Sequence, residues 1–307
     1  MKKALLIAVS LVLAVVVGVV GWVYADSTAS IRRTYALNTV VPPIPSDSAS
    51  IERGRHIAQA IAACAACHGE NLAGQVYVDQ QPVATLVPSN LTPGRGGIDS
   101  TMTDADWVNA IRHGVGRDGR TLFLMPAEVY QAMTDEDLGA LIAYLKRLPP
   151  VDNVLPPSRI GPVGRALEVF DKAPFFTAEH VDHDRAPVAR IEAGLDPRYG
   201  YYLTRMGGCI GCHGNDLAGR PVRGAPKEVP PAANLTPGGI AHYTEADFIR
   251  ALREGRRPDG RPINPIMPLT TTRHLTEDEM RAIFAYLKSL PAREFGRNIS
   301  KRSIGPA

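Results

Sequence analysis

The sequence predicts a mostly α-helical protein in which one apolar N-terminal helix precedes two tandem copies of a single domain. Three observations lead to this prediction. Residues 4–25 carry no charge and are almost entirely apolar. The segments 51–150 and 193–291 share the same short motifs in the same order. Apolar residues recur at helical spacing in both segments, and no part of the chain shows a convincing strand pattern.

The N-terminal segment, residues 1–25, has the composition of a single-pass membrane anchor. Its uncharged run covers 22 residues, and a spanning helix needs about 20. Trp22 and Tyr24 lie at its far end, where aromatic side chains favour the membrane interface. Lys2 and Lys3 predict a cytoplasmic N-terminus, which places the rest of the chain on the periplasmic side of the inner (cytoplasmic) membrane. The alternative is a cleaved secretory signal, whose apolar region is usually only about 7–15 residues long.

The remaining chain divides by composition. Residues 26–50 are rich in Ser, Thr and Pro and are expected to form a tether. Residues 151–192 contain five prolines without sustained periodicity, which predicts an extended connection between domain 51–150 and domain 193–291. Residues 292–307 form a basic tail. The period of this repeat is far longer than the roughly 20–50 residues of a solenoid, so the pattern indicates a duplicated domain.

Each domain is expected to contain equivalent helices. Residues 51–63 and 197–207 are predicted helices that lead into the cysteine motifs. Threonines are the expected N-caps of the later helices, which stop near a Gly or a Pro. These predicted helices run from Thr103 to Gly114, from Thr134 to Pro149, from Thr244 to Gly255 and from Thr276 to Pro291.

All four cysteines lie in two Cys-x-x-Cys-His motifs. The motifs consist of Cys64, Cys67 and His68, and of Cys209, Cys212 and His213. A disulfide within each motif leaves the histidine and the duplication unexplained. Structural zinc would lack a fourth ligand in each copy, and duplication makes chance negligible.

Covalent attachment of a c-type haem explains both the histidine and the repeat. Two cysteines three positions apart on a helical turn face the same way, so both can form thioethers with one haem. The adjacent histidine can then bind the iron as its proximal ligand. The sequence therefore predicts two covalently bound haem c groups.

The sixth iron ligand decides whether such an iron reacts with small molecules or mainly passes electrons. Met125 and Met267, each followed by proline, are the only two of seven methionines that occupy the same place in both domains. A thioether ligand favours ferrous iron, and both are predicted axial ligands. Filling core volume is the more usual role of methionine. That role is expected for Met102, Met133, Met206 and Met280.

With these motifs in place, both domains resemble class I cytochrome c domains. This resemblance implies that the helix before each haem motif crosses the last helix, through Gly54 and Tyr144 and through Gly200 and Tyr286. More narrowly, "NLTP", "DGR", "MP" and "AYL" are similar to segments in the cytochrome subunits of bacterial membrane-bound alcohol, aldehyde and gluconate dehydrogenases. Those subunits typically carry three haem motifs and a C-terminal anchor, whereas this chain shows two motifs and an N-terminal apolar helix.

Other polar residues are weaker candidates for the haem pockets. Asn90 and Asn234 begin the paired "NLTPG" segments and either fix a loop at the haem edge or serve as turn residues. Arginines at equivalent positions can pair with haem propionates or be solvated surface charges. They are Arg112, Arg120, Arg253 and Arg261. His180 and His183 lie in the linker and are expected to be solvated.

These observations predict an electron-transfer protein rather than an enzyme. It is expected to pass electrons from a membrane dehydrogenase or another donor to a terminal oxidase or a soluble cytochrome c. The alternative is a dihaem peroxidase-type oxidoreductase with one open haem site. A net charge of +3 and the absence of a recognition motif argue against nucleic-acid binding.

Overall fold

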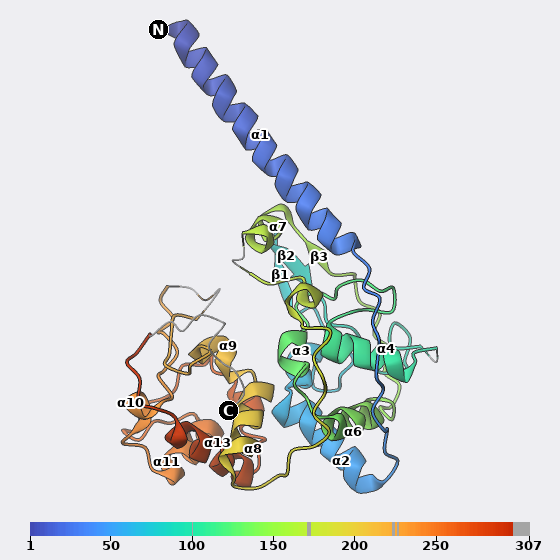
Figure 1. Cartoon of the computed structure of the whole chain (residues 1–307), viewed down its shortest axis with the longest axis vertical. Helices are drawn as coiled ribbons and strands as arrows, with labels where there is room; N and C mark the ends of the chain where they lie inside the picture. Colours follow the sequence, from blue (N-terminus) through green and yellow to red (C-terminus); the bar gives the residue numbers. More distant parts are fainter. Residues whose placement is uncertain (100, 171–172, 223–224, 226, 297–307) are drawn as a thin grey trace.

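The computed structural model describes residues 1–99, 101–170, 173–222, 225 and 227–296. A long helix, α1 (Lys2–Arg32), projects from a two-lobed, mostly helical body (Figure 1). The first lobe contains α2 (Ser48–His56), the π-helix η1 (Ile57–Ile61), α3 (Cys64–His68), β1 (Val78–Gln80), β2 (Ala84–Leu86), α4 (Asp104–Val108), the π-helix η2 (Asn109–His113), α5 (Ala127–Tyr130), α6 (Asp135–Leu145), β3 (Arg159–Ile160), α7 (Pro162–Val169) and the 3-10 helix η3 (Thr177–His180). The second lobe contains α8 (Pro197–Met206), α9 (Cys209–His213), α10 (Pro237–Ile240), α11 (Glu245–Glu254), α12 (Leu269–Thr272) and α13 (Glu277–Ser289).

Helix α1 contains the predicted membrane-spanning segment and continues beyond it. Its most apolar stretch has a mean hydropathy of 2.9 and is not buried by the rest of the chain. The helix is therefore long and apolar enough to cross a membrane, a property that signal sequences share. The expected tether is wrong for residues 26–32, which stay helical because Ser27 and Ser30 are buried against the first lobe. Beyond Arg33 the chain lies along that lobe, where the Tyr35 N–H donates to the Gly119 carbonyl at 2.8 Å.

The crossing of the first and last helices is confirmed in both lobes. Helix α2 packs on α6, and α8 packs on α13. A Cβ atom added to Gly54 would lie 2.0 Å from the Ala140 carbonyl oxygen. One added to Gly200 would lie 1.9 Å from the Ala282 carbonyl oxygen. Glycine is required because the two backbones touch at each crossing. The Cβ atoms of Tyr144 and Tyr286 lie next to Gly54 and Gly200, so both tyrosines belong to the crossing contacts, as expected.

The threonine N-caps are also confirmed. Thr103, Thr244 and Thr276 each form a reciprocal capping box with the acidic residue three positions later. Thr134 accepts a bond from the Asp137 N–H. Two predicted helices differ in detail, because 51–63 and 104–113 each change from α to π geometry midway.

The sequence predicted no strands, and this prediction is wrong. Strands β1, β2 and β3 form a small antiparallel sheet in that order, with Val78 opposite Leu86 and Thr85 opposite Arg159. These strands have two or three residues each, too few to show an alternating pattern. Their inner face covers a small core formed by Ala84, Leu86, Phe175 and Phe176.

The linker 151–192 is likewise not simply an extended connection. It contributes strand β3, helix α7 and η3, and α7 packs against α1. Pro162 occupies the first turn of α7, where its missing N–H costs nothing. The prolines that favoured an extended segment therefore include one that begins a helix. Of the predicted basic tail, residues 297–307 lie outside the described residues.

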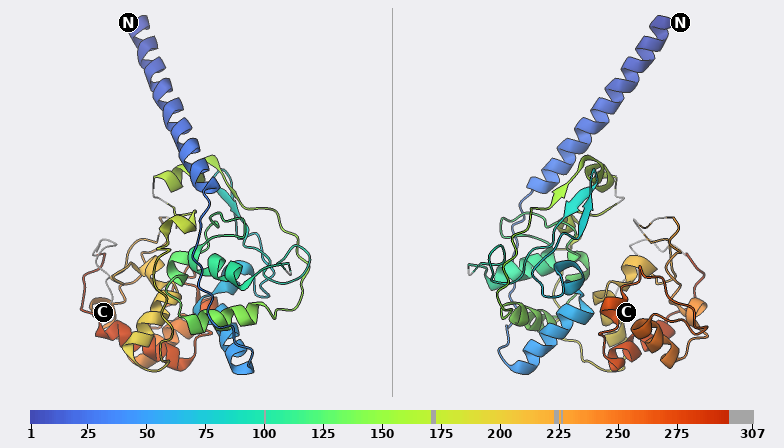
Figure 2. Two further views of the ribbon diagram at one scale, coloured as in Figure 1. Left: turned by 45° about the vertical axis from the view of Figure 1, so that its right-hand side comes forward. Right: turned by 180° about the vertical axis from the view of Figure 1, so that it is seen from behind.

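The two lobes lie side by side (Figure 2). They share one apolar core, and a polar network joins them. The Arg53 guanidinium on α2 forms two bonds to the Asp137 carboxylate, at 2.9 and 3.0 Å, and reaches Glu279 of the second lobe at 3.2 Å. Glu279 also pairs with His56 at 2.8 Å. From the second lobe, the Tyr202 hydroxyl donates to Asp137 at 2.7 Å. These bonds bridge the lobes at the base of both helical crossings.

Replacing Arg53 with alanine is expected to destabilise the protein by about 2 kcal/mol. The change removes charge-assisted bonds to two carboxylates that are largely shielded from water. Arg55→Ala, two positions along the same helix, is the matched control, since its pair with Glu52 is exposed to water and adds little stability. Denaturant unfolding of both variants measures the difference. Equal stabilities would contradict an interlobe role for Arg53.

Candidate functional site

Each Cys-x-x-Cys-His motif forms a single helical turn, α3 in the first lobe and α9 in the second. The residue before each turn has a left-handed conformation, with φ of 54° at Ala63 and 66° at Gly208. This bend separates the turn from the preceding helix. The four cysteines are half-buried, and none is in a disulfide. Burial raises the pKa of the Cys64 thiol to about 12 and that of Cys209 to about 11, so both side chains are protonated thiols at neutral pH.

The motif histidines are oriented identically in the two lobes. His68 Nδ1 lies 2.8 Å from the Ser89 carbonyl oxygen, and His213 Nδ1 lies 2.8 Å from that of Ala233. Donation from Nδ1 to a carbonyl leaves Nε2 as the free ligand atom of each ring. Among the described residues, neither Nε2 atom has a hydrogen-bond partner. Burial lowers the pKa of both histidines, against the effect of the carbonyl bond, and so favours the neutral ring that binds iron.

Asn90 and Asn234 hold the loops that present these carbonyls. The Asn90 amide donates to the Val151 carbonyl at 2.8 Å, and its oxygen accepts from the Thr92 N–H and hydroxyl. Asn234 repeats the arrangement with Arg293 and Thr236. Both asparagines follow directly after the carbonyl that binds the histidine ring. Their hydrogen bonds to the N–H two residues later are those of turn residues, and a role of this loop at the haem edge stays a prediction.

Met125 and Met267 lie at equivalent places in the two lobes. Each is half-buried and packs against the shared core, as Cys64 and Cys209 do. The carbonyl of each methionine accepts a 2.7 Å bond from the N–H two residues later, and a short helix follows, α5 or α12. Met133, Met206 and Met280 are fully buried, as expected of core residues, and Met102 is half-buried.

A segment of the linker supports the chain just before Met125, and sequence reasoning missed it. The Leu124 N–H donates to the Phe175 carbonyl at 2.9 Å. The Thr177 hydroxyl donates to the Leu122 carbonyl at 2.7 Å. Phe176 is fully buried behind this pairing. The only sequence signal was the paired phenylalanines, which are unusual in a chain with 6% aromatic residues.

The four paired arginines have different environments. Arg120 and Arg261 lie on the surface, in turns with Asp118 and Asp259, and propionate contact by either residue stays a prediction. Arg253 lies 3.8 Å from Glu277 and is also exposed. Arg112 is buried and pairs with Asp135 at 2.8 Å, so the interpretation of this residue as a solvated surface charge is wrong, and its contact with a propionate stays a prediction.

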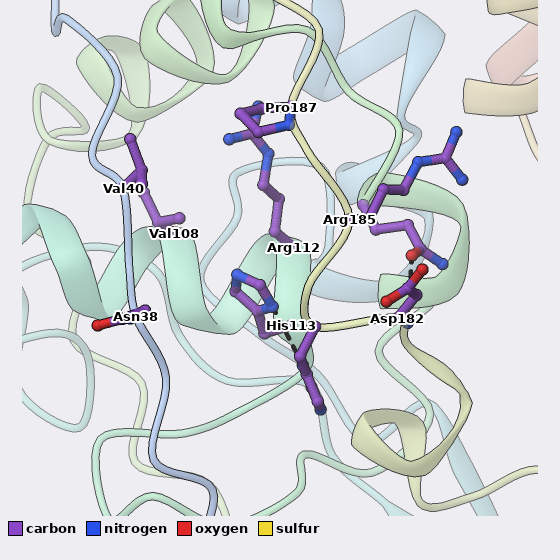
Figure 3. A pocket seen from close by; sticks show the side chains of 10 residues that line it. Asn38, Val40, Val108, Arg112, His113, Asp182, Arg185 and Pro187 are labelled. Carbon is purple, nitrogen blue, oxygen red and sulfur yellow. Dashed lines mark hydrogen bonds between the residues drawn. The ribbon is translucent and has the colours of Figure 1, made fainter.

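The expectation that His183 is solvated is wrong. His183 Nδ1 lies 3.1 Å from His113 Nδ1, at the edge of a small pocket that Arg112, Asp182 and Arg185 also line (Figure 3). His183 Nε2 is buried and has no partner among the described residues. The other linker histidine, His180, lies 3.7 Å from Glu168. In the part of the chain that the structure describes, no three His, Cys, Asp or Glu side chains are placed to hold a metal ion.

Acidification is expected to weaken this histidine contact. Burial, and then the charges of His183 and Arg112, lower the pKa of His113 from its usual 6.5 to about 4. The unfolded chain therefore takes up its proton first, and stability falls as the pH decreases from about 6.5 to about 4. Thermal unfolding midpoints across this range should depend less on pH in His113→Gln than in the unaltered protein. His242→Gln, at an exposed histidine, should keep the full dependence, and an unchanged profile in His113→Gln would refute the assignment.

The residues present fit a covalently bound haem in each lobe. Each lobe supplies two unpaired thiols on one helical turn, an adjacent imidazole with Nε2 free, and a half-buried methionine on the same core. The arrangement is duplicated down to the carbonyl that orients each histidine.

Family comparisons match each lobe separately. The family model described as "Cytochrome C oxidase, cbb3-type, subunit III" matches residues 49–145. The family model described as "Cytochrome c" matches residues 198–291. The two matches contain the two cysteine motifs and both Met-Pro segments.

Curated relatives cover most of the chain. The cytochrome c subunit of the quinone alcohol dehydrogenase of Gluconacetobacter polyoxogenes is 30% identical over 280 residues, covering 80% of this chain and 57% of the relative. The gluconate 2-dehydrogenase cytochrome c subunit of Pantoea cypripedii is 30% identical, covering 83% and 62%. A "Diheme cytochrome c-type" protein of Cereibacter sphaeroides is 28% identical, covering 68% and 73%. The chain thus spans less than two thirds of the dehydrogenase subunits that it matches.

Proposed function

Since the chain contains two tandem cytochrome c domains, we propose that it is a membrane-anchored dihaem electron carrier of the periplasm. Its electrons come from a membrane dehydrogenase and pass to a terminal oxidase or a soluble cytochrome c. The observation that carries the proposal is the duplicated arrangement of cysteine pair, carbonyl-bonded histidine and Met-Pro segment. The names of the relatives, which are cytochrome subunits of dehydrogenases, support the choice of donor.

Bound haem c supplies an iron that accepts and releases one electron. The chain holds the haem in place and closes the iron to small ligands. Each cysteine pair attaches the group, and each motif histidine presents Nε2 to the iron. Each methionine would supply its thioether sulfur as a further iron ligand, which would exclude small ligands. The proposed residues are Cys64, Cys67, His68 and Met125 in the first domain, and Cys209, Cys212, His213 and Met267 in the second.

Contacts between the lobes favour exchange of electrons within the chain. Helix α5, which follows Met125, packs against α8, which leads to the second cysteine motif. Helix α12, which follows Met267, packs against η1, which leads to the first motif. A Cβ atom added to Gly207 would lie 3.8 Å from the Ile61 carbonyl oxygen. Residues just before the two cysteine motifs therefore approach each other directly.

The N-terminal helix is proposed to remain as a single-pass anchor in the inner membrane. The buried side chains of Val23 and Ser27 and the ring contact of Trp22 with Phe170 make its last turns part of the folded first lobe. Cleavage before Asp26 would remove Trp22 and Val23 from the folded lobe. Mass spectrometry of the N-terminal peptide from isolated membranes tests retention directly.

Carbon monoxide distinguishes the carrier from the peroxidase-type alternative. The detergent-solubilised full-length protein, reduced with dithionite under argon, should show the same visible spectrum before and after exposure to carbon monoxide. It should also be reduced and reoxidised reversibly and show no turnover of hydrogen peroxide. A carbon monoxide complex at one of the haems would instead support an open, reactive site.

A further inference from the structure

A cluster of exposed aromatic side chains lies where the apolar run of α1 ends, and one of them comes from far along the chain. Trp22 and Tyr24 are 51% and 43% exposed on α1, and Phe170, just after α7, is 48% exposed. The Trp22 and Phe170 rings meet edge to face, with centroids 5.8 Å apart. We call these three residues the aromatic collar.

Arg165 fixes α7 against α1 and so sets the level of the collar. Its guanidinium lies 5.2 Å from the centroid of the Tyr24 ring. It also donates to the Ser27 hydroxyl at 2.8 Å and to the Thr28 hydroxyl at 3.1 Å. Ser27 is fully buried by this contact. Phe170 is thus held beside Trp22, while Arg165 lies one turn of α1 further from the apolar run.

The length of α1 gives the depth of that level. An α-helix rises about 1.5 Å per residue, so Trp22 lies about 27 Å along the axis from Ala4. The hydrocarbon core of a bilayer is about 30 Å thick. If the apolar run spans it, the boundary falls between Trp22 and Asp26, the first charged residue after the run. The ring contact places Phe170 at the same depth.

We propose that Phe170 enters the interface of the lipid bilayer and that the collar is a second membrane contact of the periplasmic body. This inference rests on the proposed anchor. Tryptophan and tyrosine favour the interface between hydrocarbon and headgroups, and an exposed apolar ring beside them gains by leaving water. Arg165 lies at the level of the lipid phosphates, where its positive charge is favourable. The small sheet and α7 thereby form a platform that holds the first lobe at the membrane surface (Figure 1).

Among the described residues, the helix that packs on α1 is α7 of the first lobe. The described segments of the second lobe between Gly219 and Asn234 contain no strand. The platform therefore distinguishes the two otherwise similar domains. It fixes which lobe faces the membrane and leaves the other turned away from it.

Photo-crosslinking in lipid nanodiscs tests the proposal on the full-length, haem-loaded protein. The photoreactive amino acid p-benzoylphenylalanine is placed at one position per variant, in place of Phe170, of Val12 in the apolar run, or of Phe295, which is 55% exposed on the second lobe. Irradiated protein is analysed by mass spectrometry for phospholipid adducts. An unchanged visible spectrum shows that each variant has folded.

We expect phospholipid adducts at position 170 several-fold above those at position 295, with abundant adducts at position 12. Adducts at 12 but not at 170 would overturn the collar and leave the anchor intact. Absence of adducts at both 12 and 170 would overturn the collar together with the anchor. A protein adduct in place of a lipid adduct at 170, in nanodiscs made from native membranes, would assign this surface to a protein partner.

Discussion

Met267→Ala is expected to open one iron coordination position and convert that haem into a site that binds carbon monoxide. Covalent haem content should not change, because the cysteines and His213 are untouched. The reduction potential of that haem should fall, since a thioether ligand stabilises ferrous iron. Different axial ligands vary haem potentials over a range of about 0.8 V, and the expected fall lies within that range. Spectroelectrochemistry of the full-length protein measures it.

Met125→Ala should have the same effect on the other haem, and the double variant should affect both. Met206→Leu is the matched control, since Met206 is a fully buried core residue and this exchange nearly conserves volume. It should leave both potentials and the response to carbon monoxide unchanged. A normal potential and no carbon monoxide binding in Met267→Ala would rule out this methionine as a ligand.

Gly200→Ala is expected to destabilise the second lobe by about 3 kcal/mol. Alanine is the better helix former by about 1 kcal/mol, but its Cβ atom would lie 1.9 Å from the Ala282 carbonyl oxygen. The backbones of α8 and α13 must separate to admit it, which is an overpacking cost. Because α8 leads directly into the second cysteine motif, the haem content of the expressed protein should fall as well.

Gly54→Ala should act in the same way on the first lobe. Gly194→Ala provides the control, because nothing lies within 4 Å of a Cβ atom at that position. Chemical unfolding followed by circular dichroism, with haem content per chain measured in parallel, separates the three variants. A Gly200→Ala protein as stable as Gly194→Ala would contradict the close crossing.

The parts of the structure that the sequence predicted are those with strong local or repeated signals. Capping threonines such as Thr103 predict the start of a helix from a pattern of only four residues. Duplication distinguished the two Met-Pro segments from the five other methionines. The contacts of Gly54 and Gly200 followed from resemblance to a domain type whose helices cross. Both lobes, and the haem c that their family matches imply, could therefore be predicted from the sequence.

The parts that the sequence did not predict depend on contacts between distant segments. Phe175 supports the chain just before Met125, yet it lies 50 positions further along the sequence and its own position shows no motif. His183 looked like a solvated linker residue until the fold placed it against His113. Arg112 is charged and lies on a helix, so its burial depended on Asp135 being brought within reach. Strands of two or three residues leave no periodic signal at all.

Electron paramagnetic resonance of the fully oxidised, full-length protein tests the central claim most directly. If a histidine and a methionine bind each iron, spin quantitation should give two low-spin ferric haems per chain and no high-spin signal. A high-spin ferric signal amounting to one haem per chain would contradict closed coordination at both sites and require a reactive centre in one of the lobes.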